Sequence, residues 1–319
     1  MQKNLSSTLS KKNMKIIAPA KVNLHLQILG LRNDGFHELA MVMQSINLFD
    51  IIELTPNANN QISLSTDNSD LGEEKDNLVL RAAYLLSEHS GKNHIGVSIN
   101  LKKNIPVGAG LAGGSSDAAA TLFGLNLLWN LSYSTESLLE LAAKLGSDVP
   151  FCLEGGTQFC FGRGEKLEKI ENSNNSMAII LVKDPKVSVS TPWAYSKYKD
   201  NNYSNYLFSE VDFESHRIKL RNSPYFNPIS ALSPPLLTND LQEIVLKEVN
   251  TVKTTIDILA KLPGSIGIAM SGSGPSCFAL YPDFISAHNV WLDNKKNLKE
   301  LGLESWCCEL LSGGVQLEL

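Results

Sequence analysis

The first third of the chain contains short segments rich in valine, isoleucine and leucine, separated by clusters of glycine, asparagine, aspartate and proline. This pattern predicts strands over residues 15–31, 43–55 and 61–65. Apolar and polar side chains alternate over residues 95–101. That alternation is typical of a half-exposed strand in an antiparallel or mixed sheet.

Helical periodicity follows in three segments. Apolar residues recur at helical spacing over residues 76–90, for which Asp76 is the expected N-cap. Residues 117–128 and 135–145 are predicted as two further helices. The last of these opens on a serine, threonine and glutamate stretch similar to a capping box, and it is expected to end at Gly146.

The second half of the chain alternates between strand-like and helix-like segments. The pattern predicts strands over residues 157–161, 177–182, 266–271 and 276–281, and helices over residues 239–262, as one helix or a pair, and 283–302. Residues 199–227 are rich in asparagine, serine and tyrosine and have little periodicity, so we expect a surface loop with some helix.

A length of 319 residues is about twice that of a usual domain. The polar run at residues 171–176 is the predicted boundary, which divides the chain into domains 15–171 and 172–319. Residues 1–14 are expected to form a disordered tail, with Met14 as a candidate start. Together, these elements predict an α+β fold of two domains, with mixed or antiparallel sheets flanked by helices.

Charge and composition exclude several classes of protein. A net charge of −5 argues against a general nucleic-acid binder. The longest purely apolar run, Met177–Val182, is far too short for a membrane-spanning helix, so no membrane partner is expected. Five cysteines without Cys-x-x-Cys spacing, and a start that matches no leader peptide, predict reduced thiols and a cytoplasmic protein.

The most informative segment places four glycines and two serines directly before an alanine-rich helix. Because glycine lacks a Cβ atom, several backbone N–H groups can converge on one anion, and the helix N-terminus adds partial positive charge. A helix cap with a tight turn would not need so many glycines. The segment therefore predicts a phosphate-binding loop, made of Pro106, Val107, Gly108, Ala109, Gly110, Leu111, Ala112, Gly113, Gly114, Ser115 and Ser116.

Residues 108–113 of this loop also match the dinucleotide pattern G-x-G-x-x-G. However, the preceding strand alternates, residues 102–106 separate it from the first glycine, and no strand ending in an acidic residue follows about 20 residues later. These features argue against a dinucleotide-binding fold. The chain also lacks the His-Arg-Asp and Asp-Phe-Gly motifs of protein kinases and the Gly-x-x-x-x-Gly-Lys of Walker loops.

Three segments together resemble the motifs of the GHMP small-molecule kinases: residues 18–24 with 35–37, the glycine loop, and residues 270–278. Within that family, Asp34-Gly35-Phe36-His37 and Gly146-Ser147-Asp148-Val149-Pro150 are most similar to the branch whose acceptor carries cytidine diphosphate. The resemblance implies an ATP-dependent kinase of isoprenoid precursor synthesis, with a nucleotide-binding N-terminal domain, a substrate-side C-terminal domain and an active site in the cleft between them.

The resemblance also implies the catalytic residues. Asp148 would accept the proton of the acceptor hydroxyl, and Lys21 would keep that carboxylate ionised and offset charge that develops during transfer. ATP would be bound with Mg²⁺. The residues that could contact the ion are Ser115, Ser116 or Asp117, and Ser116 is the favoured one. No metal site made by the protein alone is expected.

Further ATP contacts implied by the resemblance are Lys103 and Asn77. A solvated lysine and a helix N-terminal asparagine explain these two residues equally well. The third glycine motif would close over the active site; its residues are Ser271, Gly272, Ser273 and Gly274.

For the acceptor, the resemblance implies that Phe36 and Tyr195 sandwich a cytosine while His37 bonds its edge. Asn23, Thr191 and Pro192 would line the remainder of this site. Tyrosine is more common in the family at position 36, so the ring face remains but a hydroxyl is lost. Another small-alcohol kinase, of the homoserine or mevalonate type, and a catalytically inactive ligand-binding relative stay open, as do a monomer and a homodimer.

Overall fold

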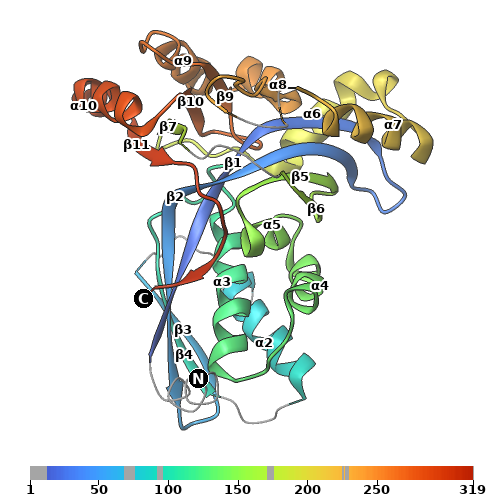
Figure 1. Cartoon of the computed structure of the whole chain (residues 1–319), viewed down its shortest axis with the longest axis vertical. Coiled ribbons are helices and arrows are strands. Elements are labelled where there is room, and N and C mark those ends of the chain that lie inside the picture. The colour runs from blue at the N-terminus through green and yellow to red at the C-terminus, as the bar shows by residue number, and fades with distance from the viewer. Residues whose placement is uncertain are drawn as a thin grey trace.

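The structure, a computed structural model, describes residues 13–67, 76–91, 96–170, 176–224, 226 and 230–318. The predicted tail, except for residues 13 and 14, and the predicted boundary, except for residue 176, lie outside the described residues. Within these, the chain forms two sheets with helices packed on them (Figure 1). The predicted α+β class is confirmed.

The described strands of the first sheet are built around one long antiparallel hairpin of β1 and β2, whose register shifts between Pro19 and Ala20 and between Asn23 and His25. β5 pairs with the first part of β2 and β4 with its last part, so the hairpin extends from one end of the sheet to the other. This sheet contains β1 (Met14–Leu31), β2 (His37–Asn57), β3 (Ile62–Thr66), β4 (Gly96–Lys102), β5 (Thr157–Gly162), β6 (Lys166–Lys169), β8 (Thr238–Asn239) and β12 (Gln316–Leu317).

Helices cover one side of this sheet, where α2, α3 and α4 lie together (Figure 1). The buried apolar side chains of these helices form one core with those of the hairpin, among them Ile16, Leu54 and Leu125. The alanines and leucines of α3 allow it to pack closely on β1 and β2. These helices are α2 (Leu78–Ser90), α3 (Gly113–Leu128), α4 (Thr135–Leu145) and α5 (Val149–Glu154).

The second sheet is antiparallel in the order β11-β7-β10-β9, and α9 and α10 pack on it. Its described elements are β7 (Ala178–Lys183), α8 (Asp240–Glu248), α9 (Asn250–Leu259), β9 (Gly267–Met270), β10 (Cys277–Tyr281), α10 (Phe284–Glu300) and β11 (Glu304–Glu309). The segment between β7 and α8 contains α6 (Thr191–Asn202), the 3₁₀ turn η3 (Tyr203–Asn205) and α7 (Glu210–Arg221). Strands β8 and β12 return to the first sheet, where both pair with β1. The domain division at residue 171 stays a prediction.

Two helix starts differ from the prediction. α3 begins at Gly113, four residues before the predicted start, because the glycines and serines of the motif form its first turn. α2 is capped by Asn77 rather than Asp76, since the Asn77 side chain accepts a 2.9 Å hydrogen bond from the backbone N–H of Val79. The predicted Gly146 end of α4 is confirmed.

Residues 199–227 are largely helical where they are described, so the segment contains more helix than the expected loop with some helix. Ser190 and Ser209 cap α6 and α7 through hydrogen bonds to backbone N–H groups. α7 buries only Phe213, Arg217 and Leu220, which is too narrow an apolar stripe to stand out in the sequence. The segment is therefore helical through its caps and tertiary contacts rather than through a strong local pattern.

Candidate active site

A cavity of about 820 Å³ lies between the hairpin, the glycine loop, α6 and the third glycine motif. Most residues predicted for the site line it: Lys21, Asn23, Phe36, His37, Lys103, residues 106–115, Asp148, Thr191, Pro192, Tyr195, Gly272 and Ser273. Five predicted residues that the structure also describes lie outside this lining: Asn77, Ser116, Asp117, Ser271 and Gly274. The fold thus gathers all three motifs around one cavity.

The glycine loop presents backbone to this cavity. Gly108 and Gly110 have φ angles of +63° and +75°, which glycine adopts without strain. Ala112 is the N-cap of α3 and makes no side-chain capping bond, so the first N–H groups of the helix remain free for an anion. Ser115 lines the cavity, whereas the fully buried Ser116 donates its hydroxyl to the carbonyl of Pro19 at 2.7 Å.

The third glycine motif packs directly on this loop. Ser271 Oγ donates to the carbonyl of Gly110 at 3.0 Å and accepts from the backbone N–H of Asn23 at 3.3 Å. Asn239, which the sequence did not indicate, donates through Nδ2 to the carbonyls of Met270 and Gly272, at 2.8 Å each. Ser271 therefore acts beneath the cavity, where it holds the two motifs together.

Gly110→Ala should destabilise the protein and weaken ATP binding. A Cβ at Gly110 would lie 2.3 Å from the carbonyl oxygen of Ser271, at a φ of +75°. The left-handed backbone alone costs an L-residue about 1–2 kcal/mol, which should lower the melting temperature by at least about 2 °C. Gly114→Ala is the matched control for stability, because its Cβ would meet only Leu78 Cδ1, at 3.8 Å. Equal melting temperatures for the two variants would contradict this prediction.

Lys21 and Asp148 face each other at the centre of the cavity. Ala20, Val22 and Leu24 are fully buried in the core, so strand alternation turns Lys21 to the opposite side of β1. Its Nζ lies 3.7 Å from Asp148 Oδ2 and donates to Asn23 Oδ1 at 2.7 Å and to the Gly110 carbonyl at 3.2 Å.

Asp148 occupies the N-cap position of α5, yet its side chain makes no capping hydrogen bond. The carboxylate is 33% exposed, whereas the Lys21 side chain is 5% exposed. The aspartate is therefore the member of the pair that a substrate hydroxyl could reach. The lysine is held from behind by acceptors of the hairpin and the loop.

Lys103 lines the cavity, but its ammonium is already bound by two buried carboxylates. It donates to Asp117 Oδ2 at 2.7 Å and pairs with Asp50, whose other oxygen accepts from the backbone N–H of Ile105. Burial raises the pKa of Asp117 well above its usual value, although Lys103 opposes the shift. This cluster anchors the residues that lead into the glycine loop. Asn77 is likewise occupied, since its side chain caps α2.

The other end of the cavity is aromatic. The rings of His37 and Tyr195 lie 5.1 Å apart, and His37 Nε2 shares a 2.8 Å hydrogen bond with the hydroxyl of Tyr206. Burial, followed by the charge of Lys199, lowers the pKa of His37, so the ring is neutral at pH 7. Phe36 is half exposed, and Arg163 packs on it with Cζ 4.8 Å from the ring centroid.

Tyr206, Arg163 and Lys199 are neighbours of the aromatic residues that the sequence reasoning missed. Tyr206 lies just after η3 in the segment expected to be a loop, and Lys199 lies on α6, where no motif marks either residue. Arg163 follows β5 in a Gly-Arg-Gly turn, a pattern that signals a turn but not a site. Only the tertiary contacts bring these residues to the predicted ones.

The cavity lining includes the oxygen-bearing side chains of Ser115 and Asp148, which are hard ligands of the kind that Mg²⁺ prefers. Elsewhere, the described residues contain no group of three or more His, Cys, Asp or Glu side chains placed to hold a metal ion. Nor does any helix in the described part have the length and apolar character needed to cross a membrane.

Comparison with known proteins identifies the family. Residues 77–156 match the model of the GHMP kinases N terminal domain, and residues 229–300 match that of the GHMP kinases C terminal domain. A 4-diphosphocytidyl-2-C-methyl-D-erythritol kinase from Prochlorococcus marinus is 52% identical over 319 residues, 100% of each chain. The chain belongs to the GHMP kinase family. A relative of the same name from a Synechococcus species is 54% identical over 304 residues, 95% of this kinase and 99% of the relative.

Solved structures agree with this assignment. A crystal structure of 4-(cytidine 5'-diphospho)-2C-methyl-D-erythritol kinase matches this GHMP kinase with a TM-score of 0.70 and 31% identity, over 94% of this chain and 100% of the other. A homoserine kinase from Cytophaga hutchinsonii matches with a TM-score of 0.67 and 18% identity, over 97% and 98%. At that identity the second likeness extends to the fold alone. The predicted two-domain GHMP architecture is confirmed.

Proposed function

We propose that this GHMP kinase transfers the γ-phosphate of ATP to the 2-hydroxyl of 4-diphosphocytidyl-2-C-methyl-D-erythritol, a step of non-mevalonate isoprenoid precursor synthesis. The observation that carries the proposal is a single cavity with a phosphate-binding loop, a Lys21 and Asp148 pair, and an aromatic end around His37. The full-length relatives, which are named for this activity, support the choice of acceptor.

In this proposal, Asp148 accepts the proton of the acceptor hydroxyl as the hydroxyl oxygen attacks the γ-phosphorus of ATP. The bond between that phosphorus and the ADP oxygen breaks, so ADP leaves with its electron pair. Lys21 lies 3.7 Å from the carboxylate and beside the Gly110 carbonyl, so its charge falls between the base and the phosphate-binding loop. There it would offset the negative charge of the transferring group.

The nucleotide phosphates would bind to the glycine loop and the free N–H groups at the start of α3. Mg²⁺, when bound with ATP, neutralises phosphate charge. Ser115 and Asp148 are the lining side chains placed to help hold it, while Ser116 is occupied by Pro19. Ser115 is thus assigned to ligand binding, whereas Ser116 stabilises the fold.

At the aromatic end, a cytosine would lie beside Phe36 and Tyr195 with its polar edge toward His37. A neutral imidazole carries one N–H, so the hydrogen bond at Nε2 decides whether Nδ1 donates or accepts. Tyr206 makes that bond at 2.8 Å. A tyrosine hydroxyl can donate or accept, so this bond holds the orientation of the His37 ring and is compatible with either tautomer.

Tyr206→Phe should raise the KM for the cytidine acceptor and leave kcat and the KM for ATP unchanged. A neutral hydrogen bond of this kind contributes about 0.5–1.5 kcal/mol, so we expect roughly a twofold to tenfold rise. Steady-state kinetics with each substrate varied would measure it. Tyr203→Phe is the control, because it removes the same hydroxyl from a ring that is 49% exposed and that contacts Tyr206 rather than His37. Equal KM values for the two variants would exclude the role assigned to Tyr206.

A coupled assay of ADP release tests the proposed function. The enzyme is given ATP and Mg²⁺ with the cytidyl acceptor, homoserine, mevalonate or no acceptor, and the phosphorylated product is identified by mass spectrometry. We expect turnover with the cytidyl acceptor alone. Turnover with homoserine or mevalonate would identify that compound as the acceptor in place of the cytidyl one. ADP release without any acceptor would reject the assignment as a kinase of this acceptor. Binding of the cytidyl acceptor without turnover would indicate an inactive relative.

A further inference from the structure

The turn between β5 and β6 places an arginine at the aromatic end of the cavity. Arg163 is half-buried and lines the cavity together with Phe36, His37 and Lys199. Its guanidinium packs on the ring of Phe36, with Cζ 4.8 Å from the centroid. Because a guanidinium stacked on a ring keeps its N–H groups in its own plane, these donors remain available to a ligand.

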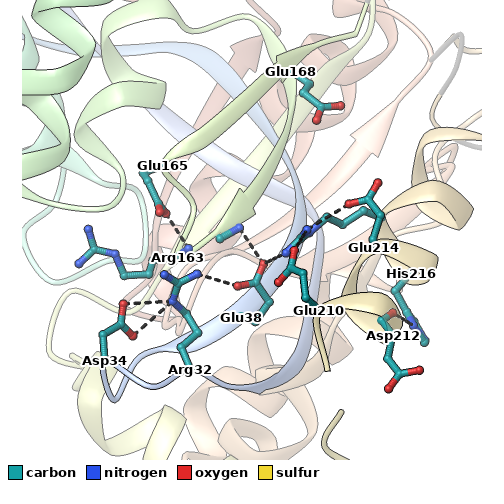
Figure 2. Close-up of polar contacts among 12 residues, drawn as sticks. Arg32, Asp34, Glu38, Arg163, Glu165, Glu168, Glu210, Asp212, Glu214 and His216 are labelled. Carbon is teal, nitrogen blue, oxygen red and sulfur yellow. Dashed lines mark hydrogen bonds and ion pairs between the residues drawn. The ribbon is translucent and has the colours of Figure 1, made fainter. Parts of the chain in front are cut away.

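The backbone of this turn is held by two carboxylates (Figure 2). Glu165 accepts from the backbone N–H of Arg163 at 2.6 Å, and Glu38 accepts from that of Gly162 at 3.1 Å. Gly164 brings the turn close to Asp148, since a Cβ at Gly164 would lie 3.8 Å from Asp148 Oδ1. The arginine is therefore presented by a rigid turn beside the proposed catalytic base.

Neighbouring arginines are neutralised by carboxylates, but Arg163 is not. Arg32 and Arg217 pair with Glu38 at 2.7 Å and 2.5 Å, and Arg221 pairs with Glu168 at 2.7 Å. In contrast, no carboxylate of the described residues lies within 4 Å of the Arg163 guanidinium, which Figure 2 shows directed away from Glu38. Asp34 interacts with the Arg163 charge only from beyond 4 Å, so the guanidinium N–H groups are left for something that enters the cavity.

The other cations of the lining are differently placed. Lys21 is paired with Asp148, and Lys103 is held by two buried carboxylates. Lys199, on α6, has no carboxylate partner within 4 Å in the described part of the chain, and it lies near enough to His37 to lower that ring's pKa. Arg163 and Lys199 thus supply unpaired positive charge at the end of the cavity where the acceptor would bind.

We infer that Arg163 binds the diphosphate of the acceptor while its flat face rests on Phe36. The inference rests on the proposed function, which gives the acceptor a cytidine at the aromatic end and a diphosphate between that base and the reacting hydroxyl. A planar guanidinium forms paired, charge-assisted hydrogen bonds to phosphate oxygens. Arg163 would therefore select acceptors that carry the diphosphate, whereas His37 and the aromatic rings select the base.

Binding of cytidine, CMP and CDP tests this assignment. Isothermal titration of the whole enzyme, with the ATP site filled by a non-hydrolysable ATP analogue, would compare the native protein with Arg163→Ala. We expect Arg163→Ala to weaken CDP binding about tenfold to a hundredfold, the range for hydrogen bonds to charged groups, and to change cytidine binding less than twofold. Arg163→Lys should recover part of the CDP affinity, because it restores the charge but not the paired geometry.

Arg81→Ala is the matched control, because it removes the same charge from an exposed position of α2 outside the cavity lining. An equal loss for cytidine and CDP would overturn the inference and leave Arg163 as a support for Phe36. A phosphate-dependent loss in Lys199→Ala but not in Arg163→Ala would overturn it in favour of Lys199. Failure of the native enzyme to bind any cytidine compound would reject the proposed function itself.

Discussion

Replacing Asp148 with asparagine should severely slow phosphoryl transfer while both substrates still bind. Asparagine keeps the size and polarity of the side chain but cannot accept the acceptor's proton. General base catalysis typically contributes about 10²–10⁴-fold to a rate, and we expect kcat to fall by that factor. The KM for the acceptor should change little, because the carboxylate is assigned no role in binding the cytidine.

The surroundings of Asp148 explain why this loss should come without unfolding. The carboxylate is 33% exposed and makes no capping hydrogen bond to α5. The buried residues that follow it, Val149 and Pro150, anchor the helix without its help. We therefore expect the melting temperature of Asp148→Asn to stay close to that of the native enzyme.

The coupled ADP assay measures kcat, and thermal unfolding measures stability in the same preparation. Asp257→Asn is the control, since Asp257 is exposed on α9 and loses the same charge away from the cavity. Near-normal turnover of Asp148→Asn would remove this residue from the mechanism. A fall in melting temperature that accounts for the lost activity would assign it a structural role instead.

Lys21→Met should lower kcat by about 10²–10³-fold, the loss expected when one charged donor to a transition state is removed. Methionine fills a similar volume but offers neither the charge nor the donors that now reach Asn23, Gly110 and Asp148. The loss should fall on kcat more than on the acceptor KM, because the charge being stabilised develops during transfer.

Lys102→Met is the matched control for this prediction. Lys102 is also an ion-paired strand lysine, 2.8 Å from Glu53, but it lies outside the cavity lining. Single-turnover kinetics with saturating ATP and acceptor would separate the chemical step from binding. If Lys21→Met raised the acceptor KM and left the chemical step unchanged, Lys21 would be a binding residue and its assignment to the transition state would be wrong.

Local patterns in the sequence were sufficient for much of the fold. The valine, isoleucine and leucine content of residues 15–31 predicted a strand, and β1 confirms it. The burial of Ala20, Val22 and Leu24 explains why Lys21 faces the cavity. The capped and periodic segment of residues 135–145 is a helix with the predicted bounds. These features are determined by residues a few positions apart, so they can be read without knowing the rest of the chain.

Local sequence patterns did not predict the structure where it depends on contacts between residues that are distant along the chain. Residues 199–227 lack a broad apolar stripe, yet α7 forms, with its buried Arg217 paired to Glu38 on β2. Lys103 has the appearance of a solvated lysine, but Asp50 and Asp117 hold it in the interior. Neither outcome could be predicted from neighbours in the sequence, because the partners are distant along the chain.

The sequence by itself determined the family, and it predicted the glycine loop as the anion-binding element and Lys21 and Asp148 as the catalytic residues. The tertiary structure decided which of them meet. Ser271 contacts Gly110 across 161 residues, and His37 contacts Tyr206 across 169. A motif records the chemistry of a short segment, whereas the orientation of a side chain, its charge partners and its access to the cavity depend on what the folded chain brings beside it.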